Sequence, residues 1–264
     1  MIIPTLSVCA VMLAVMTTAW VVQRVTANGG WVDVFWSFGT GICCAGAILM
    51  APTGGAPWRS ALVAALTVTW SVRLGGYIAG RVSRGPEDVR YAALRREWGA
   101  DFDRRLLRFV LIQAPVSAIL AMAALYAARR PDPAFGVQDG IGVAVALGAI
   151  AGETLADRQM KRFKSDPASK GKVCDRGLWA WSRHPNYFFE AVLWLAFPAI
   201  GTDPGNGWSL ASWLAPLVMG VILRYGSGVP PLEAAMLRAK GDAYRRYQEQ
   251  VPAFFPQPPK NARR

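Results

Sequence analysis

The sequence is poor in charged residues and holds a single histidine. Asp, Glu, Lys and Arg make up 17% of its 264 residues, against roughly 25% in soluble domains, so an ordinary soluble domain is disfavoured. The four cysteines are scattered and fit neither a disulfide framework nor a metal site. We therefore expect no bound metal. No Gly-x-Gly-x-x-Gly run follows a predicted strand, so a Rossmann dinucleotide site is not expected.

Apolar residues make up 53% of the chain, and they gather in long stretches. A helix that spans a bilayer needs ~20 such residues. The long stretches are Ile2–Val22, Trp31–Met50, Ala61–Ile78, Phe109–Ala128 and Ile141–Leu155, and the shorter ones are Phe188–Ile200 and Trp208–Leu223. The first lacks a basic start and a clear cleavage site, so we interpret it as a helix rather than a signal peptide. The sequence predicts an all-α integral membrane protein, a single domain over residues 1–264 with seven transmembrane helices; six or eight are the alternatives.

The net charge of +12 is concentrated in alternate loops. Three groups of eight basic residues follow the third, fifth and seventh predicted spans. They are Arg81, Arg84, Arg90, Arg95, Arg96, Arg104, Arg105 and Arg108; Arg158, Lys161, Arg162, Lys164, Lys170, Lys172, Arg176 and Arg183; and Arg224, Arg238, Lys240, Arg245, Arg246, Lys260, Arg263 and Arg264. The opposite side has only Arg59, Arg129 and Arg130. The positive-inside rule then predicts an outer N-terminus and a cytoplasmic C-terminus. Contact with anionic lipids explains the charge better than nucleic acid does.

Ionisable side chains interrupt the predicted spans, where each costs ~2.5–3.5 kcal/mol on insertion scales and usually faces a cavity or a partner. Asp33 lies near the start of the second span and Arg73 late in the third. Tyr77 follows Arg73 by one turn, on the same helix face.

Two carboxylates, Glu153 and Asp157, lie four residues apart near the inner end of the fifth span and share one face. They would repel each other without a cation or a hydrogen-bond donor between them, which indicates a ligand site. The alternative is a purely structural pairing with Arg158, Lys161 or Arg183.

The run Gly177–Glu190, which we call the signature segment, holds the only histidine and joins a charged segment to an apolar one. Its polar and aromatic members are Trp179, Arg183, His184, Asn186, Tyr187 and Glu190. An aromatic belt, a proline at a helix start and polar caps could each explain part of the run. Together they do not explain the cation, imidazole and carboxylate side by side. Arg183 and the N-terminus of the following helix predict a site for an anionic ligand.

Several pieces of the chain form a recognisable set. They are Gln23, Val32–Trp36, Trp70–Leu74, Glu87–Tyr91, Glu153–Lys164, Gly177–Trp179, Ser182–Tyr187, Ser227–Pro230 with Glu233, and Tyr244–Tyr247 before Phe254–Pro256. As a set they resemble the steroid 5-alpha-reductase-like superfamily, most closely its bacterial branch of DUF1295 membrane proteins. The histidine-proline-x-tyrosine piece alone is shared with isoprenylcysteine methyltransferase-like proteins.

The resemblance implies a membrane reductase that uses NADPH, bound from the cytoplasm among the C-terminal helices of residues 131–264. The residues it implies for the cofactor are Glu153, Asp157, Lys164, Arg176, Trp179, Arg183, His184, Asn186, Tyr187, Glu190, Arg238, Tyr244 and Arg245. An apolar enone such as a 3-oxo-4-ene steroid would enter from the bilayer between the helices of residues 1–130. Asp33 and Tyr77 would bind its carbonyl, and the reaction would be 5-alpha reduction at the bacterial inner membrane.

Other interpretations stay open at this point. Arg73 could hold Asp33 ionised, leaving Tyr77 as the only donor. The family pattern is described with glutamate, and Asp33 is one methylene shorter. A membrane methyltransferase that uses S-adenosylmethionine and a non-catalytic sterol- or lipid-binding protein are the rival functions. The sequence leaves open whether the substrate is a steroid, a fatty enone or an isoprenoid ketone, and it leaves open the oligomeric state.

Overall fold

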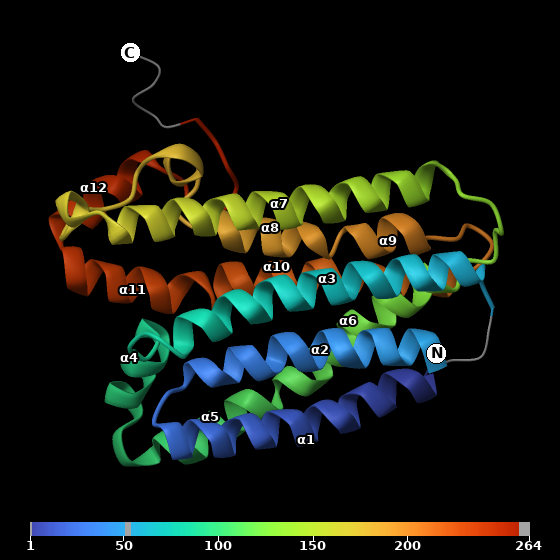
Figure 1. The fold of residues 1–264 in the computed structure, drawn as a ribbon, viewed down its shortest axis with the longest axis horizontal. Helices are drawn as coiled ribbons and strands as arrows, with labels where there is room; N and C mark the ends of the chain where they lie inside the picture. The colour runs from blue at the N-terminus through green and yellow to red at the C-terminus, as the bar shows by residue number, and fades with distance from the viewer. Residues whose placement is uncertain (1, 51–53, 259–264) are drawn as a thin grey trace. The chain divides into compact units, whose positions relative to one another are not determined.

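The computed structural model describes residues 2–50 and 54–258, and over these residues every regular element is a helix (Figure 1). The α-helices are α1 (Ile2–Thr26), α2 (Gly30–Met50), α3 (Pro57–Val82), α4 (Val89–Trp98), α5 (Phe102–Leu111), α6 (Gln113–Ala128), α7 (Val137–Ser165), α8 (Pro185–Leu193), α9 (Ala196–Gly201), α10 (Leu214–Tyr225), α11 (Val229–Lys240) and α12 (Asp242–Gln250). Short 3-10 helices are η1 (Gly99–Asp101), η2 (Pro167–Ser169), η3 (Gly177–Ala180) and η4 (Gly207–Trp213). The tail cations Lys260, Arg263 and Arg264 lie outside the described residues.

Six helical stretches of the described chain are long and apolar enough to cross a membrane. They are Ile2–Thr26, Gly30–Met50, Pro57–Val82, Val89–Ala128, Val137–Ser165 and Gly207–Lys240. The chain is therefore a multi-pass helical membrane protein, with one candidate span fewer than the seven predicted.

Prolines explain why some predicted spans are interrupted. Proline lacks an N–H and its ring clashes with the carbonyl four residues earlier, so a helix tends to break there. The carbonyl four residues before Pro198 is that of Trp194, and the expected span Phe188–Ile200 is divided there into α8 and α9. The carbonyl four residues before Pro115 is that of Leu111, where α5 ends. Hydropathy counts these stretches as continuous because it ignores the backbone.

The chain forms two compact units. Unit 1 comprises Met1–Ala144 and Trp194–Ala215, and unit 2 comprises Val145–Leu193 and Pro216–Arg264. Each unit is described separately below.

Small residues bring α2 close to its neighbours in unit 1. A Cβ at Gly41 would lie 2.1 Å from the Cβ of Ser71, so only glycine permits this approach of α2 to α3. Beside it the Ser71 hydroxyl donates to the Ser37 carbonyl at 3.0 Å. The hydroxyls of Thr40 and Ser117 lie 2.8 Å apart and join α2 to α6. Close packing and hydroxyl contacts are what holds helices together where lipid surrounds them.

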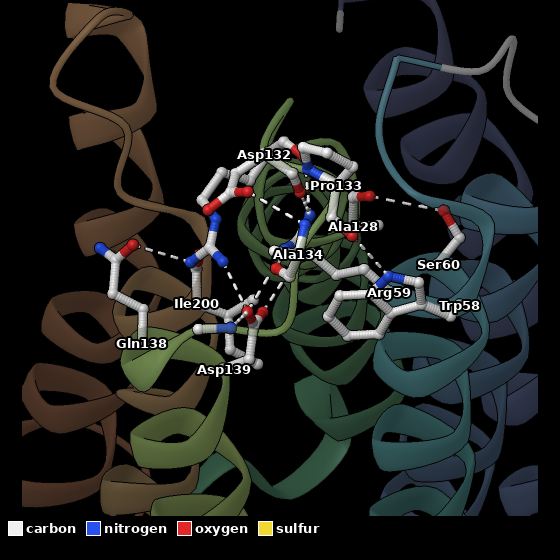
Figure 2. A network of polar contacts seen from close by, with 12 residues as sticks. Trp58, Arg59, Ser60, Ala128, Asp132, Pro133, Ala134, Gln138, Asp139 and Ile200 are labelled. Atoms are coloured by element: carbon white, nitrogen blue, oxygen red, sulfur yellow. Dashed lines mark hydrogen bonds and ion pairs between the residues drawn. The ribbon is translucent and has the colours of Figure 1, made fainter.

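A buried ionic network closes one end of unit 1 (Figure 2). Asp139 accepts from Arg59 Nε at 2.8 Å and from Arg130 Nη2 at 2.5 Å. The side chains of Arg59 and Asp139 are 0% exposed and that of Arg130 is 4% exposed. The Arg59 guanidinium also donates to the carbonyls of Arg130, Asp132 and Ala134, so the α6–α7 turn wraps around it. The sequence placed Arg59 and Arg130 on the side opposite the basic loops, and the structure shows that both are buried.

Unit 2 is built on the part of α7 that follows Val145. A Cβ at Gly152 would lie 2.4 Å from the Phe189 ring, so glycine lets α8 pack closely on α7. The tail pairs with the signature segment through backbone bonds from Arg183 N to Pro252 O and from Gln257 N to Trp181 O, both 2.9 Å long. The stretch Leu232–Gln250 is divided between α11 and α12 at Gly241, whose φ is +52°. Glycine adopts that left-handed conformation at no steric cost.

Candidate functional site

The signature segment is held against α7 by side chains of both elements. Gly177 has a φ of +59°, and a Cβ there would lie 2.5 Å from the carboxamide of Gln159. That carboxamide accepts from Leu178 N at 2.9 Å, and the Trp179 indole donates to the Ala156 carbonyl at 3.0 Å. These contacts position η3, and Pro185 then begins α8 at the first helical position, where proline is favoured.

Glu233 on α11 is the centre of a polar cluster that we call the Glu233 cluster. Its carboxylate accepts from Arg183 Nε at 2.9 Å and Arg183 Nη2 at 2.8 Å, a bidentate pair. It also accepts from His184 Nε2 and Tyr244 OH, both at 2.7 Å, and from Gln248 Nε2. Arg183 Nη1 donates to the carbonyls of Gln248 and Val251. The guanidinium that the sequence predicted for a phosphate is thus engaged with α11 and the tail.

His184 is 1% exposed, and desolvation by burial lowers the pKa of its imidazole despite the opposing effect of Glu233. Because a carboxylate can only accept, Nε2 carries the ring proton of the neutral form. Nδ1 is then an acceptor, and it is buried with no hydrogen-bond partner among the described residues. The ring stacks on Tyr187 at a centroid distance of 5.8 Å.

Three carboxylates are buried in unit 2, two of them on α7 and one on α8. Glu153, Asp157 and Glu190 are 4%, 5% and 5% exposed. Asn186 Nδ2 donates to Asp157 Oδ1 at 3.4 Å, so the facing sides of α7 and α8 meet there. Asn186 and Glu190 repeat the four-residue spacing of Glu153 and Asp157. A buried carboxylate is costly unless it is paired or hydrogen-bonded, so polar groups gather in this part of unit 2.

Basic and aromatic residues complete the predicted cofactor set in unit 2. Lys164, Arg176, Arg238 and Arg245 are exposed, as solvated phosphate-binding groups would be. Tyr244 is buried, and burial together with Glu233 raises the pKa of its phenol well above the usual value. It therefore stays protonated and acts as a donor.

Asp33 lies in unit 1 and is held by α4. Its carboxylate accepts from Arg90 Nη2 at 2.5 Å and from Tyr91 OH at 2.8 Å. Arg90 also contacts Asp88, which caps α4. Although burial raises the pKa of Asp88, the charges of Arg90 and Arg81 and the hydrogen bonds from Arg90 together outweigh it, and the pKa ends well below its usual range.

Tyr77, the other predicted catalytic residue, lies on α3 in unit 1. Its ring is half-buried and the Arg73 guanidinium lies 5.6 Å from the ring centroid. Asp33 and Tyr77 therefore belong to unit 1, and every residue of the predicted cofactor set belongs to unit 2.

The family model of DUF1295, described as a protein of unknown function, matches residues 19–251. The chain belongs to the DUF1295 family. This family is steroid 5-alpha reductase-like.

A relative is the uncharacterized protein C594.04c of Schizosaccharomyces pombe, 30% identical over 231 residues. The match covers 75% of this chain and 63% of that protein, so the chain spans under two thirds of its relative. No solved structure matches the chain.

Two contributors to the unit 2 site were not among the predicted site residues. Glu233 and Gln248 lie 50 and 65 positions from Arg183, and no local spacing connects them to it. The available signal for Glu233 was its place beside Ser227–Pro230 among the pieces that carry the family resemblance.

Proposed function

We propose that this DUF1295 protein is an NADPH-dependent reductase of the C=C bond of an apolar enone, with a 3-oxo-4-ene steroid as the expected substrate. The observation that carries the proposal is the burial of Glu153 and Asp157 on α7 and of Glu190 on α8, where Asn186 donates to Asp157. The relation of the family to steroid 5-alpha reductases supports it.

The residues of unit 2 fit the chemistry of NADPH. Buried carboxylates at Glu153, Asp157 and Glu190 accept hydrogen bonds, which suits ribose hydroxyls and a carboxamide NH₂. The buried Nδ1 of His184 is a further acceptor without a donor among the described residues. The exposed cations of the set, Lys164, Arg176, Arg238 and Arg245, suit the phosphates, including the 2′-phosphate.

Arg183, Tyr244 and Trp179 take part as positioning residues. Arg183 and Tyr244 bind Glu233 and tie the tail to the signature segment. Trp179 is bonded to Ala156 on α7 and accepts at its carbonyl from Tyr247 OH at 2.5 Å. These contacts keep the imidazole of His184 in place, where it is 1% exposed.

When bound, NADPH supplies a hydride to the β-carbon of the enone. The protein must then polarise the carbonyl oxygen as enolate charge develops, before the α-carbon takes a proton. We assign this donation to the Tyr77 hydroxyl; the Arg73 guanidinium lies 5.6 Å from the centroid of the Tyr77 ring. Asp33 is paired with Arg90 and accepts from Tyr91 OH. We therefore assign it to holding α4 in place and not to binding the substrate carbonyl.

The proposed setting is the inner membrane of a bacterium, with the cofactor site facing the cytoplasm. The basic loops alternate as required for an outer N-terminus and a cytoplasmic C-terminus. Under this proposal the segment Pro185–Gly201 crosses as an interrupted seventh span.

A thermal-shift comparison of cofactors tests the proposal on the purified full chain. NADPH should raise the melting temperature more than NADH does, because only NADPH carries the 2′-phosphate, and S-adenosylmethionine should have no effect. Arg238→Gln should weaken the NADPH shift, whereas Arg246→Gln, an equally exposed control on α12, should not. Stabilisation by S-adenosylmethionine alone would favour a methyltransferase, and sterol binding with no response to NADPH would favour a lipid-binding protein.

A further inference from the structure

A cavity of about 230 Å³ opens at the end of unit 1, where α6 and α9 finish. Neither the reduction nor the cofactor site uses it. Its polar lining residues are Tyr126, Arg129, Arg130, Asp203, Asn206 and Ser209. The volume is below the ~300–1,000 Å³ of pockets for drug-sized ligands, so it suits a headgroup-sized fragment.

Arg130 is one of two arginines that line the cavity, and one of its donors makes no hydrogen bond to the described residues. The side chain is 4% exposed and belongs to the buried network around Asp139. Its Nη1 donates to Gln138 Oε1 and to the Ile200 carbonyl, both at 2.8 Å, and its Nη2 donates to Asp139. Its Nε is buried without a hydrogen-bond partner among the described residues. Leaving a buried cationic donor unsatisfied is costly, so native structures usually supply an acceptor.

The charges around the cavity favour an anion as that acceptor. Arg129 and Arg130 line it, against the single carboxylate of Asp203, which also accepts from Gly205 N at 2.9 Å. Asp139 lies behind Arg130, and the charge of Asp139 is shared with Arg59. The lining therefore keeps one net positive charge.

The surface beside the cavity is apolar. Asn206 and Ser209 flank Trp208, which is 79% exposed. Leu210 and Trp213 of η4, and Leu214 at the start of α10, are also exposed. Exposed tryptophans gather where headgroups meet acyl chains. An anion bound here would thus lie next to a surface that suits lipid tails.

We propose that this cavity binds the phosphate of an anionic phospholipid headgroup, with the acyl chains lying along η4. Arg130 Nε and the Arg129 guanidinium donate to the phosphate oxygens, and the Tyr126 hydroxyl offers a further donor. This inference does not depend on the reductase activity.

The test uses the purified full chain in a zwitterionic detergent with phosphatidylglycerol that carries a photoactivatable group on its headgroup. Adducts mapped by mass spectrometry should fall in residues 126–131 and 201–214. Arg129→Gln removes a positive charge and Asn206→Asp adds a negative one, so each lowers the net charge of the lining by one unit. The Asp oxygen still caps the Trp208 N–H, as Asn206 does at 3.2 Å. Each variant should weaken labelling at the cavity about tenfold in a lipid titration, as expected for one lost charge-assisted contact.

Arg104→Gln is the matched control, because this arginine side chain is 67% exposed and lies outside the cavity; its labelling at residues 126–131 and 201–214 should equal wild type. Competition by millimolar glycerol phosphate would support the anion site but assign it to a soluble phosphate ester. Labelling confined to the basic loops 81–108 and 158–183 would overturn the proposal. Folded Arg129→Gln and Asn206→Asp variants that label like wild type would do the same.

Discussion

Replacing Glu233 by glutamine should loosen α11 and the residues that follow it from the signature segment. The carboxylate is the shared acceptor for Arg183, His184, Tyr244 and Gln248. Glutamine keeps one acceptor oxygen but places an NH₂ group among these donors and removes the charge opposite Arg183.

The magnitude follows from burial. The Arg183 and Glu233 side chains are 10% and 13% exposed. Breaking a buried ion pair costs ~3–5 kcal/mol, because it leaves one charge uncompensated. Since both groups keep some contact with water, we expect the lower end, about 3 kcal/mol, and a fall in melting temperature on the order of 10 °C.

Thermal unfolding in detergent and limited proteolysis of the tail together measure this effect. Glu233→Gln should melt earlier, and cleavage between residues 226 and 258 should become faster than in the wild type. Glu249→Gln is the matched control, because Glu249 is exposed on α12, and it should behave like wild type. A melting temperature for Glu233→Gln within 2 °C of the control, well below the shift expected from ~3 kcal/mol, would refute the structural role of the Glu233 cluster.

Three further outcomes are expected. Tyr77→Phe should lower turnover about a hundredfold through loss of one donor with NADPH affinity kept, whereas Tyr225→Phe, on a side chain that is exposed, should change neither. Burial lowers the pKa of His184, so the unfolded chain binds more protons and stability should decline as the pH falls below about 6.5; this slope should flatten in His184→Gln, which removes the only histidine. Asp139→Asn should destabilise unit 1 by about 3–5 kcal/mol because it leaves two buried arginines without a counter-charge, and chemical denaturation should show no such loss for Asp242→Asn.

The helices of the long apolar stretches were predictable because their composition alone requires them in a bilayer. Spacing also predicts that Glu153 and Asp157 share one face of α7, and that Asn186 and Glu190 share one face of α8, but it does not predict that these two faces meet. The interruption of the span at Phe188–Ile200 had a visible cause in Pro198, but hydropathy does not register a lost backbone hydrogen bond.

Contacts between distant residues were beyond sequence reasoning. Arg59 and Asp139 are 80 positions apart, and the distribution of charge predicted the side on which Arg59 lies but not its partner. Asp33 was expected near Tyr77 or Arg73, and its contacts to Arg90 and Tyr91 depend on how α4 folds back onto α2. Periodicity gives the face of one helix and does not identify the partner that this face meets.

The most direct test of the reductase proposal is NADPH oxidation by the purified chain across a panel of apolar enones, with the product mass measured. The account predicts oxidation that depends on both enone and protein, and a product heavier than the substrate by two hydrogens. A steroid, a fatty enone and an isoprenoid ketone in the panel identify the substrate class. If NADPH binds but no member of the panel gains hydrogen, or if NADPH does not bind at all, the reductase assignment is contradicted.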